Sequence, residues 1–173
     1  MPLHIIIDGY NLIRQSNELS RFDDQDIQLG REVLLEKLAS YRRFKHHKLT
    51  VVFDGACAPT GSTFRDTFQG IHVRYSHTGE LADTVIKRMA ATEKQRALIV
   101  TSDQDVIHFS QIQGCATIGS PEFEDKMMLA ALMENGQLTD EPESGWTPTT
   151  KKRGPSRKMS KKERRNRIKT GKL

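Results

Sequence analysis

The sequence predicts an α/β domain of three layers, α/β/α, around a central and mostly parallel sheet, followed by a flexible basic tail. Its short apolar runs are rich in β-branched residues and are continuous rather than alternating, which is typical of strands covered on both faces. Amphipathic helical patterns lie between these runs, and this alternation favours parallel strands joined by right-handed crossovers. With 173 residues, the chain is long enough for one domain with a buried core and short for two.

Each expected strand is a short apolar run between polar or turn-forming residues. The first run begins almost at the amino terminus, and the last, "CATI", is the weakest. The strands are expected at His4–Ile7, Leu49–Phe53, Ile71–Tyr75, Ala97–Thr101 and Cys115–Ile118.

The expected helices repeat apolar residues at three- and four-residue spacing. Three of them cover Asp26–Phe44, Glu80–Ala91 and Gln104–Gln111. A fourth is "SPEFEDKMMLAALMEN", in which Ser120 is a candidate N-cap and Pro121 suits the first turn. Gly136 ends this last pattern.

Composition divides the chain into a domain, a linker and a tail. Residues 1–136 are expected to form the domain, and residues 137–150 are rich in Pro, Gly, Ser and Thr, which is typical of a flexible linker. Residues 151–173 hold twelve of the 27 Lys and Arg and one of the 22 acids, which leaves 15 bases and 21 acids in the rest of the chain. The domain is therefore mildly acidic and the tail strongly basic.

The tail is expected to be disordered and to bind RNA by neutralising phosphates. Ser160 and Glu163 have capping-box spacing, but almost no apolar residue is available for burial, so a helix is expected there only on a partner. The alternative is a solvated tail that aids solubility or is an expression artefact. The residues expected to contact RNA are Lys151, Lys152, Arg153, Arg157, Lys158, Lys161, Lys162, Arg164, Arg165, Arg167 and Lys169.

Several classes of protein lack support in the sequence. The two cysteines, Cys57 and Cys115, do not have the C-x-x-C spacing of zinc sites and fit a reducing compartment. "MPLH" lacks the basic start of a signal peptide and no apolar run approaches ~18 residues, so a soluble cytoplasmic protein without membrane association is expected. No P-loop, G-x-G-x-x-G or G-x-S-x-G motif is present, which argues against an ATPase, a dinucleotide enzyme or a serine-hydrolase elbow.

Acids follow each of four successive strands, directly or in the first turn of the next helix. In an open parallel sheet, ligands gather beyond the carboxyl ends of the strands, so these side chains are expected at one edge. They are Asp8 after the first strand, with Asn11 three residues on, Asp54 after the second, Glu80 and Asp83 after the third, and Asp103 and Asp105 after the fourth, beside Ser102.

Each acid alone also has a structural explanation. Asp54 precedes a glycine, as is common in turns. Glu80 and Asp83 would favour a helix macrodipole by roughly 0.3–1 kcal/mol each, and Asp103 is a candidate N-cap. Clustered carboxylates repel one another and raise their pKa values, so the whole set favours a bound cation.

The residue types predict a hard cation and phosphate chemistry. Carboxylate and amide oxygens favour Mg²⁺ or Mn²⁺ over zinc, which prefers His and Cys, and the six histidines show no metal-binding spacing. One or two such ions would polarise a phosphodiester and generate hydroxide from bound water.

These motifs also resemble a known family. "IIIDGYNLIR", "VVFDG", "GELADTVIKRM" and "VTSDQDV", in that order over roughly residues 1–135, resemble the NYN domains of the PIN-like nuclease superfamily, and their bacterial YacP-like branch in particular. The resemblance implies the PIN-like three-layer fold and a metal-dependent endoribonuclease that hydrolyses RNA phosphodiester bonds, in mRNA decay or RNA processing. By motif it implies Asp8, Asp83 and Asp103 as metal-binding catalytic acids, Asp54 and Glu80 as further catalytic acids, and Asn11, Ser102 and Asp105 as groups that support the ligands or orient substrate.

One departure and one alternative accompany the resemblance. "SDQD" carries two acids, as in wider NYN and PIN-like domains, whereas YacP-like proteins often have only the first. The alternative function is a non-catalytic RNA- or ribosome-binding protein on a nuclease-like scaffold. The intact acidic set favours the enzyme.

Overall fold

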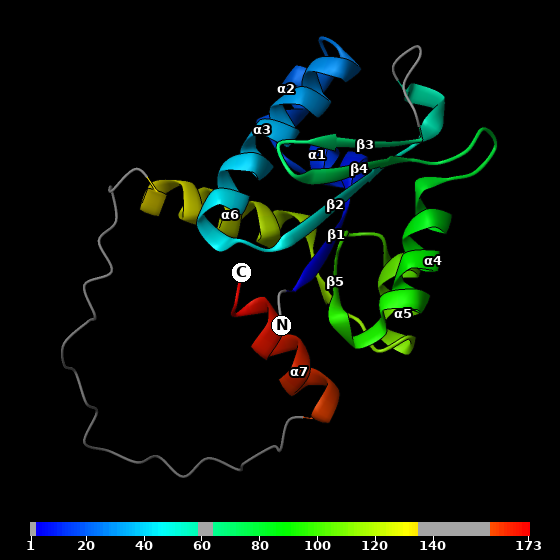
Figure 1. Ribbon diagram of the computed structural model, residues 1–173, viewed down its shortest axis with the longest axis vertical. Coiled ribbons are helices and arrows are strands. Elements are labelled where there is room, and N and C mark those ends of the chain that lie inside the picture. Colours follow the sequence, from blue (N-terminus) through cyan, green and yellow to red (C-terminus); the bar gives the residue numbers. More distant parts are fainter. Residues whose placement is uncertain (1–2, 59–63, 135–159) are drawn as a thin grey trace.

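The computed structural model describes residues 3–58, 64–134 and 160–173, and within these ranges the chain builds a six-stranded sheet (Figure 1). The strands lie in the order β3-β4-β2-β1-β5-β6. All neighbours are parallel except β3, which pairs antiparallel with β4 at one edge. The expected mostly parallel α/β fold is therefore confirmed. The strands are β1 (His4–Asp8), β2 (Lys48–Phe53), β3 (Arg65–Phe68), β4 (Ile71–Tyr75), β5 (Ala97–Val100) and β6 (Ala116–Ile118).

The continuous apolar runs are explained by helices on both faces of the sheet. Successive side chains of a strand point to opposite faces. Ile5 and Ile7 accordingly join the core cluster under one helical layer, while Ile6 joins the cluster under the other. All three side chains are fully buried.

The helices divide into two layers (Figure 1). One layer packs α3 against α2 and α6, and α1 against all three, and the other packs α4 against α5. None of the helices in the described ranges is long and apolar enough to cross a membrane. The first layer is α1 (Gly9–Gln15), α2 (Leu19–Asp23), α3 (Ile27–Lys45) and α6 (Ser120–Glu134), and the second is α4 (Ala82–Glu93) and α5 (Gln104–Ile112).

Three elements were not expected from the sequence. Strand β3 is short and polar, and a two-residue turn of Gln69 and Gly70, both with positive φ, joins it to β4. Helix α2 has only five residues and contributes one buried side chain, Leu19. Helix α1 begins directly after β1, with no linker, and Asp8 caps it. Gly9 leaves room for the Phe53 ring, with which an added Cβ would collide.

The carboxyl-terminal residues differ from the expected disordered tail. Residues Lys161–Thr170 form helix α7, which lies along the edge strand β6. Asn166 accepts a hydrogen bond from the Thr117 N–H (2.8 Å) and donates one to the Thr117 C=O (3.1 Å). Leu173 is buried in the core. The partner that stabilises this helix is thus the domain itself, through polar pairing with backbone that the apolar pattern does not reveal.

The expected linker, residues 137–150, and the first basic residues of the tail, up to residue 159, lie outside the described residues. Among the expected RNA-binding residues on α7, Lys169 is partly buried and donates to the C=O groups of Gln95 and Ala97. Its exposed neighbours are Lys161, Lys162, Arg164, Arg165 and Arg167.

Candidate active site at the carboxyl end of the sheet

The acids that follow the strands meet at the carboxyl end of the sheet. Asp8 is the last residue of β1, Asp54 follows β2, Asp83 lies in the first turn of α4, and Asp103 is the N-cap of α5. Because β2, β1 and β5 are neighbours, Asp8 lies between the ends of the other two strands. Asp8, Asp54, Asp83 and Asp103 are called the carboxylate edge below.

Asp8 is the buried member of the carboxylate edge, with 6% of its surface exposed. Its Oδ1 accepts a hydrogen bond from the Asn11 backbone N–H (3.2 Å), which caps α1, and its Oδ2 accepts one from the Thr101 hydroxyl (3.1 Å). The pKa of Asp8 is raised to about 6, chiefly by burial. The two hydrogen bonds oppose this change, and the charges of Asp83 and Asp54 add to it.

Asp83 and Asp103 also interact with each other through their charges. The pKa of Asp83 is raised, first by burial and then by the charge of Asp103, while Lys87 opposes the change. Asp103 caps α5 by accepting from the N–H groups of Asp105 (2.8 Å) and Val106 (3.1 Å). The exposed Asp105 forms an ion pair with Lys87 instead of extending the carboxylate edge.

Asp54 and Glu80 hold the start of α4. Asp54 Oδ1 accepts a hydrogen bond from the Ala82 N–H (2.8 Å), so this carboxylate joins the end of β2 to the amino terminus of the helix that carries Asp83. Glu80 forms an ion pair with Arg88 and accepts a bond from the His77 N–H (3.4 Å). Burial acts to raise the pKa of Glu80, but the bonds from His77 and Arg88 together outweigh it and lower the pKa. Glu80 therefore faces Arg88, and its predicted place among the catalytic acids stays a prediction.

Asn11 joins three segments behind Asp8. Its Oδ1 accepts from the Ser102 N–H (2.8 Å) and from the Ser120 hydroxyl (2.7 Å), and Ser102 Oγ accepts from the Ser120 N–H (3.2 Å). The loop after β5 and the start of α6 are thereby fixed to α1. Sequence reasoning assigned Ser120 only a cap and missed Thr101. A hydroxyl at the end of a strand, next to the acids, was the available signal.

The donor atoms suit a hard cation, although the described residues include no three His, Cys, Asp or Glu groups arranged closely enough to hold a metal ion. The carboxylate edge offers oxygen atoms alone, the ligands that Mg²⁺ and Mn²⁺ prefer. Asp83 raises the pKa of Asp8, and Asp103 raises that of Asp83. A cation would relieve this repulsion, so the chemistry of the site fits a divalent ion.

Comparisons with known proteins agree with this architecture. The chain is 29% identical over 86 residues to YacP of Bacillus subtilis, and the aligned segment spans 50% of this chain and 50% of YacP. A crystal structure of a mutant of Rae1 (YacP) from Bacillus subtilis matches with a TM-score of 0.67 and 21% identity, covering 78% of this chain and 80% of that one. The structure of unmutated Rae1 (YacP) gives 0.62 and 22%, covering 79% of each chain. The family profile described as the YacP-like NYN domain matches residues 5–169, which includes most of α7. The chain therefore belongs to the YacP-like NYN domain family.

Proposed function

We propose that this protein is an endoribonuclease that hydrolyses RNA phosphodiester bonds with Mg²⁺ or Mn²⁺, in mRNA decay or RNA processing. The observation that carries the proposal is the buried Asp8, whose pKa is raised to about 6 beside other acids at the carboxyl end of the sheet. A carboxylate kept in such surroundings lowers the stability of the fold, and groups of this kind cluster at functional sites. Membership of an NYN family supports nuclease chemistry.

The acids have separable roles in this proposal. Asp8, Asp83 and Asp103 would hold one or two ions. When bound, such an ion polarises the phosphodiester and activates water. Asp54 positions the helix that carries Asp83 through its bond to Ala82.

The polar groups behind these acids keep them in place. Thr101 donates to Asp8 and accepts from the Asp103 N–H (3.1 Å), so it fixes two acids relative to each other. Asn11 and Ser102 hold the surrounding loops, and we propose no contact between Asn11 Oδ1 and substrate because that atom already accepts two bonds.

Cleavage of RNA under titrated metal tests the proposal. Purified protein is expected to cut mixed RNAs once Mg²⁺ or Mn²⁺ is added, and Asp8→Asn or Asp83→Asn is expected to lower the rate at least about 100-fold, because each removes a charged ligand. Circular dichroism should show that both variants stay folded. Asp24→Asn, at an exposed position after α2, is the matched control and should cut like the wild type. Wild-type rates in both site variants would contradict the assignment.

A non-catalytic RNA- or ribosome-binding protein is the second candidate. It is favoured by one observation, that no metal-binding group of three side chains is preformed in the described ranges. It predicts salt-sensitive RNA binding that is indifferent both to metal and to Asp8→Asn, without cleavage at any metal concentration.

A further inference from the structure

A basic groove lies between β4 and α4, on the face of the sheet that α4 covers only in part. Val52 of β2 packs under α4, and the register places Arg74 beside Val52 and His72 beside Thr50 on the same face. The groove is lined by Lys48, His72, Arg74 and Arg88, together with His4 and Glu93. Arg65 of β3, directly opposite Arg74, lines the adjoining surface and extends the groove to the edge of the sheet.

The two arginines of the hairpin create a local excess of positive charge. Arg65 and Arg74 are a cross-strand pair in the antiparallel ladder, and like charges directly opposite each other lower stability. Within the described residues, the Arg74 side chain makes no hydrogen bond or ion pair, and it is partly buried. Burial, and then the charge of Arg65, lower its pKa. An anion bound between them would relieve this repulsion.

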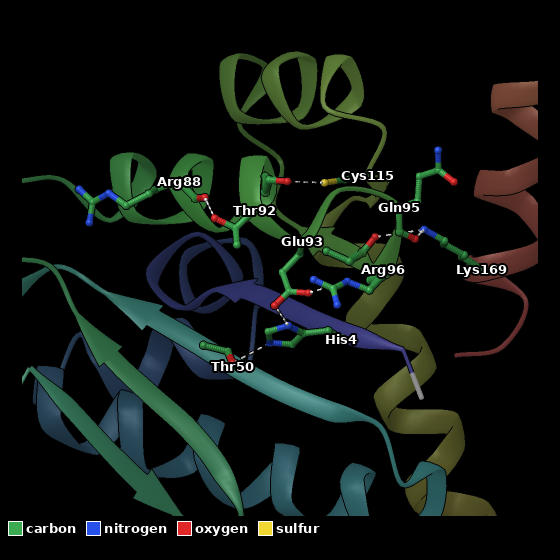
Figure 2. Close-up of polar contacts among 11 residues, drawn as sticks. His4, Thr50, Arg88, Thr92, Glu93, Gln95, Arg96, Cys115 and Lys169 are labelled. Atoms are coloured by element: carbon green, nitrogen blue, oxygen red, sulfur yellow. Dashed lines mark hydrogen bonds and ion pairs between the residues drawn. The ribbon is translucent and has the colours of Figure 1, made fainter. Parts of the chain in front are cut away.

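The acids next to the groove already have partners. Glu93 contacts His4 Nδ1 (3.3 Å) and Arg96 Nε (3.4 Å), and Figure 2 shows this carboxylate above the His4 ring. The other ring nitrogen of His4 contacts Thr50 Oγ1 (2.9 Å). On β3, Asp66 accepts a hydrogen bond from the neighbouring backbone N–H (2.7 Å). Neither acid forms an ion pair with Arg74, on which Glu93 acts only through its charge.

The lining of the groove begins at the amino ends of β1 and β2, at His4 and Lys48, and reaches Arg88 in the middle of α4. Arg88 and Asp83 are five residues apart on this helix, or ~7.5 Å along its axis at 1.5 Å per residue. Arg88 also pairs with Glu80, which precedes the helix. A strand bound in the groove would have to extend past Arg88 and along α4 to reach the acids.

An aromatic pair lies at the same end of the hairpin. The Phe64 ring, in the residue before β3, lies 4.2 Å from the ring of His77, and Phe64 is 51% exposed. The His77 N–H donates to Glu80. Proteins commonly hold single-stranded nucleic acid by combining a basic groove, which contacts the phosphates, with exposed aromatic rings, on which the unpaired bases stack.

We propose that the basic groove binds a single strand of RNA, with phosphates on Arg65, Arg74 and Arg88 and a base against the Phe64–His77 pair, and directs that strand to the carboxylate edge. This inference rests on the proposed function and adds the substrate class and its path. Double-stranded RNA would bind less well, because its paired bases cannot stack on the aromatic pair.

Binding and cleavage can be measured separately to test the groove. Fluorescence anisotropy with a labelled single-stranded RNA of about 12 nucleotides is measured on the full chain carrying Asp8→Asn, so that no cut interferes. Adding Arg74→Gln is expected to weaken binding about tenfold and to reduce the slope of log affinity against log salt by ~0.7; with Arg65→Gln as well, the slope should fall by ~1.4. Phe64→Ala should weaken binding about tenfold with the slope unchanged.

Matched controls keep the result interpretable. Arg21→Gln, exposed on α2 in the opposite layer, should bind like its parent, and Arg74→Lys should retain the salt slope even if packing of the Gln variant is altered. Unchanged affinity and slope in the double arginine variant would overturn the groove while leaving metal-dependent cleavage by the wild type intact. The groove proposal would also be overturned if the variants lost as much affinity for duplex RNA as for single-stranded RNA. The same holds if poly-glutamate of equal charge displaced the labelled RNA as well as unlabelled RNA does. If the protein binds RNA through the groove but does not cleave it, only the proposed nuclease function is contradicted, and the groove proposal stands.

Discussion

At the residue scale, Asp8 is expected to destabilise the metal-free fold. Its pKa is raised from 3.8 to about 6, so between these values the folded state binds more protons than the unfolded state, and stability falls as pH rises through that window. Two pKa units correspond to at most about 3 kcal/mol. Asp8→Asn should therefore be more stable than the wild type at pH above about 6 in EDTA, by roughly 1–3 kcal/mol.

Urea denaturation across pH measures this effect. The advantage of Asp8→Asn is expected to vanish at about pH 3, below the unfolded-state pKa of 3.8, where the folded and unfolded wild type are both largely protonated at Asp8. The exposed Asp24→Asn variant should show no such dependence. A loss of stability in Asp8→Asn at pH 8 without metal would show that the carboxylate is structural.

Members of the site could be predicted where a polar residue follows directly on a buried strand. Asp8 stands out because a buried strand ends in it, with Asn11 three residues later, and the structure places Asp8 at that end and Asn11 in the helix that follows. Thr101 and Ser120 were not predicted as parts of the site, since a hydroxyl in a loop is compatible with many roles. Their partners come from residues 93 and 109 positions away in sequence, and a local pattern cannot reveal such pairs.

At the element scale, α7 is expected to stabilise the sheet by covering its edge. Exposed edge strands favour association with other chains, and Asn166 pairs with both backbone groups of Thr117 on β6. Asn166→Ala should cost about 1–2 kcal/mol in free energy of unfolding, because two hydrogen bonds are lost at about 0.5–1.5 kcal/mol each. Lys162→Ala, exposed on the same helix, is the control.

The same contacts change how the basic tail should be tested. Removing residues 151–173 would delete both positive charge and the cover of β6, so weaker RNA binding by such a protein would not identify its cause. Substitution of exposed cations on α7 separates the two effects. If Asn166→Ala unfolds at the same urea concentration as Lys162→Ala, the helix does not stabilise the domain.

Elements were predictable where they bury a periodic apolar face. Five strands and four helices follow from that signal, within a few residues at each end. Strand β3 does not show the burial pattern typical of a strand, because three of its four residues are exposed. It is held by its pairing with β4. Helix α7 is held by Asn166, Lys169 and the buried Leu173, so its order depends on tertiary contacts that the sequence pattern does not contain.

At the scale of the whole molecule, like charges cluster in two places. One cluster is acidic and suits a cation, and the other is basic and suits an anion. The carboxylate edge gathers four acids, and the pKa values of Asp8 and Asp83 rise through burial and the charges of neighbouring acids. The basic groove gathers arginines on the adjoining face of β3 and β4. Neither arrangement favours folding by itself. Under the proposed function, a bound cation would offset the repulsion among the acids and a bound phosphate chain would offset that among the arginines.

Metal binding should therefore reverse the stability order of two variants. A ligand that binds only the folded state stabilises it by about 2.7 kcal/mol at 100 times its Kd, so Mg²⁺ should raise the unfolding midpoint of the wild type. Asp8→Asn, the more stable protein in EDTA, lacks one ligand and should gain much less, and the wild type should become the more stable of the two. The gain should shrink below about pH 6, because a protonated Asp8 cannot ligate a metal. Asp24→Asn should gain as much as the wild type. An equal gain for Asp8→Asn would place the ion elsewhere on the molecule, whatever the result of the cleavage assay.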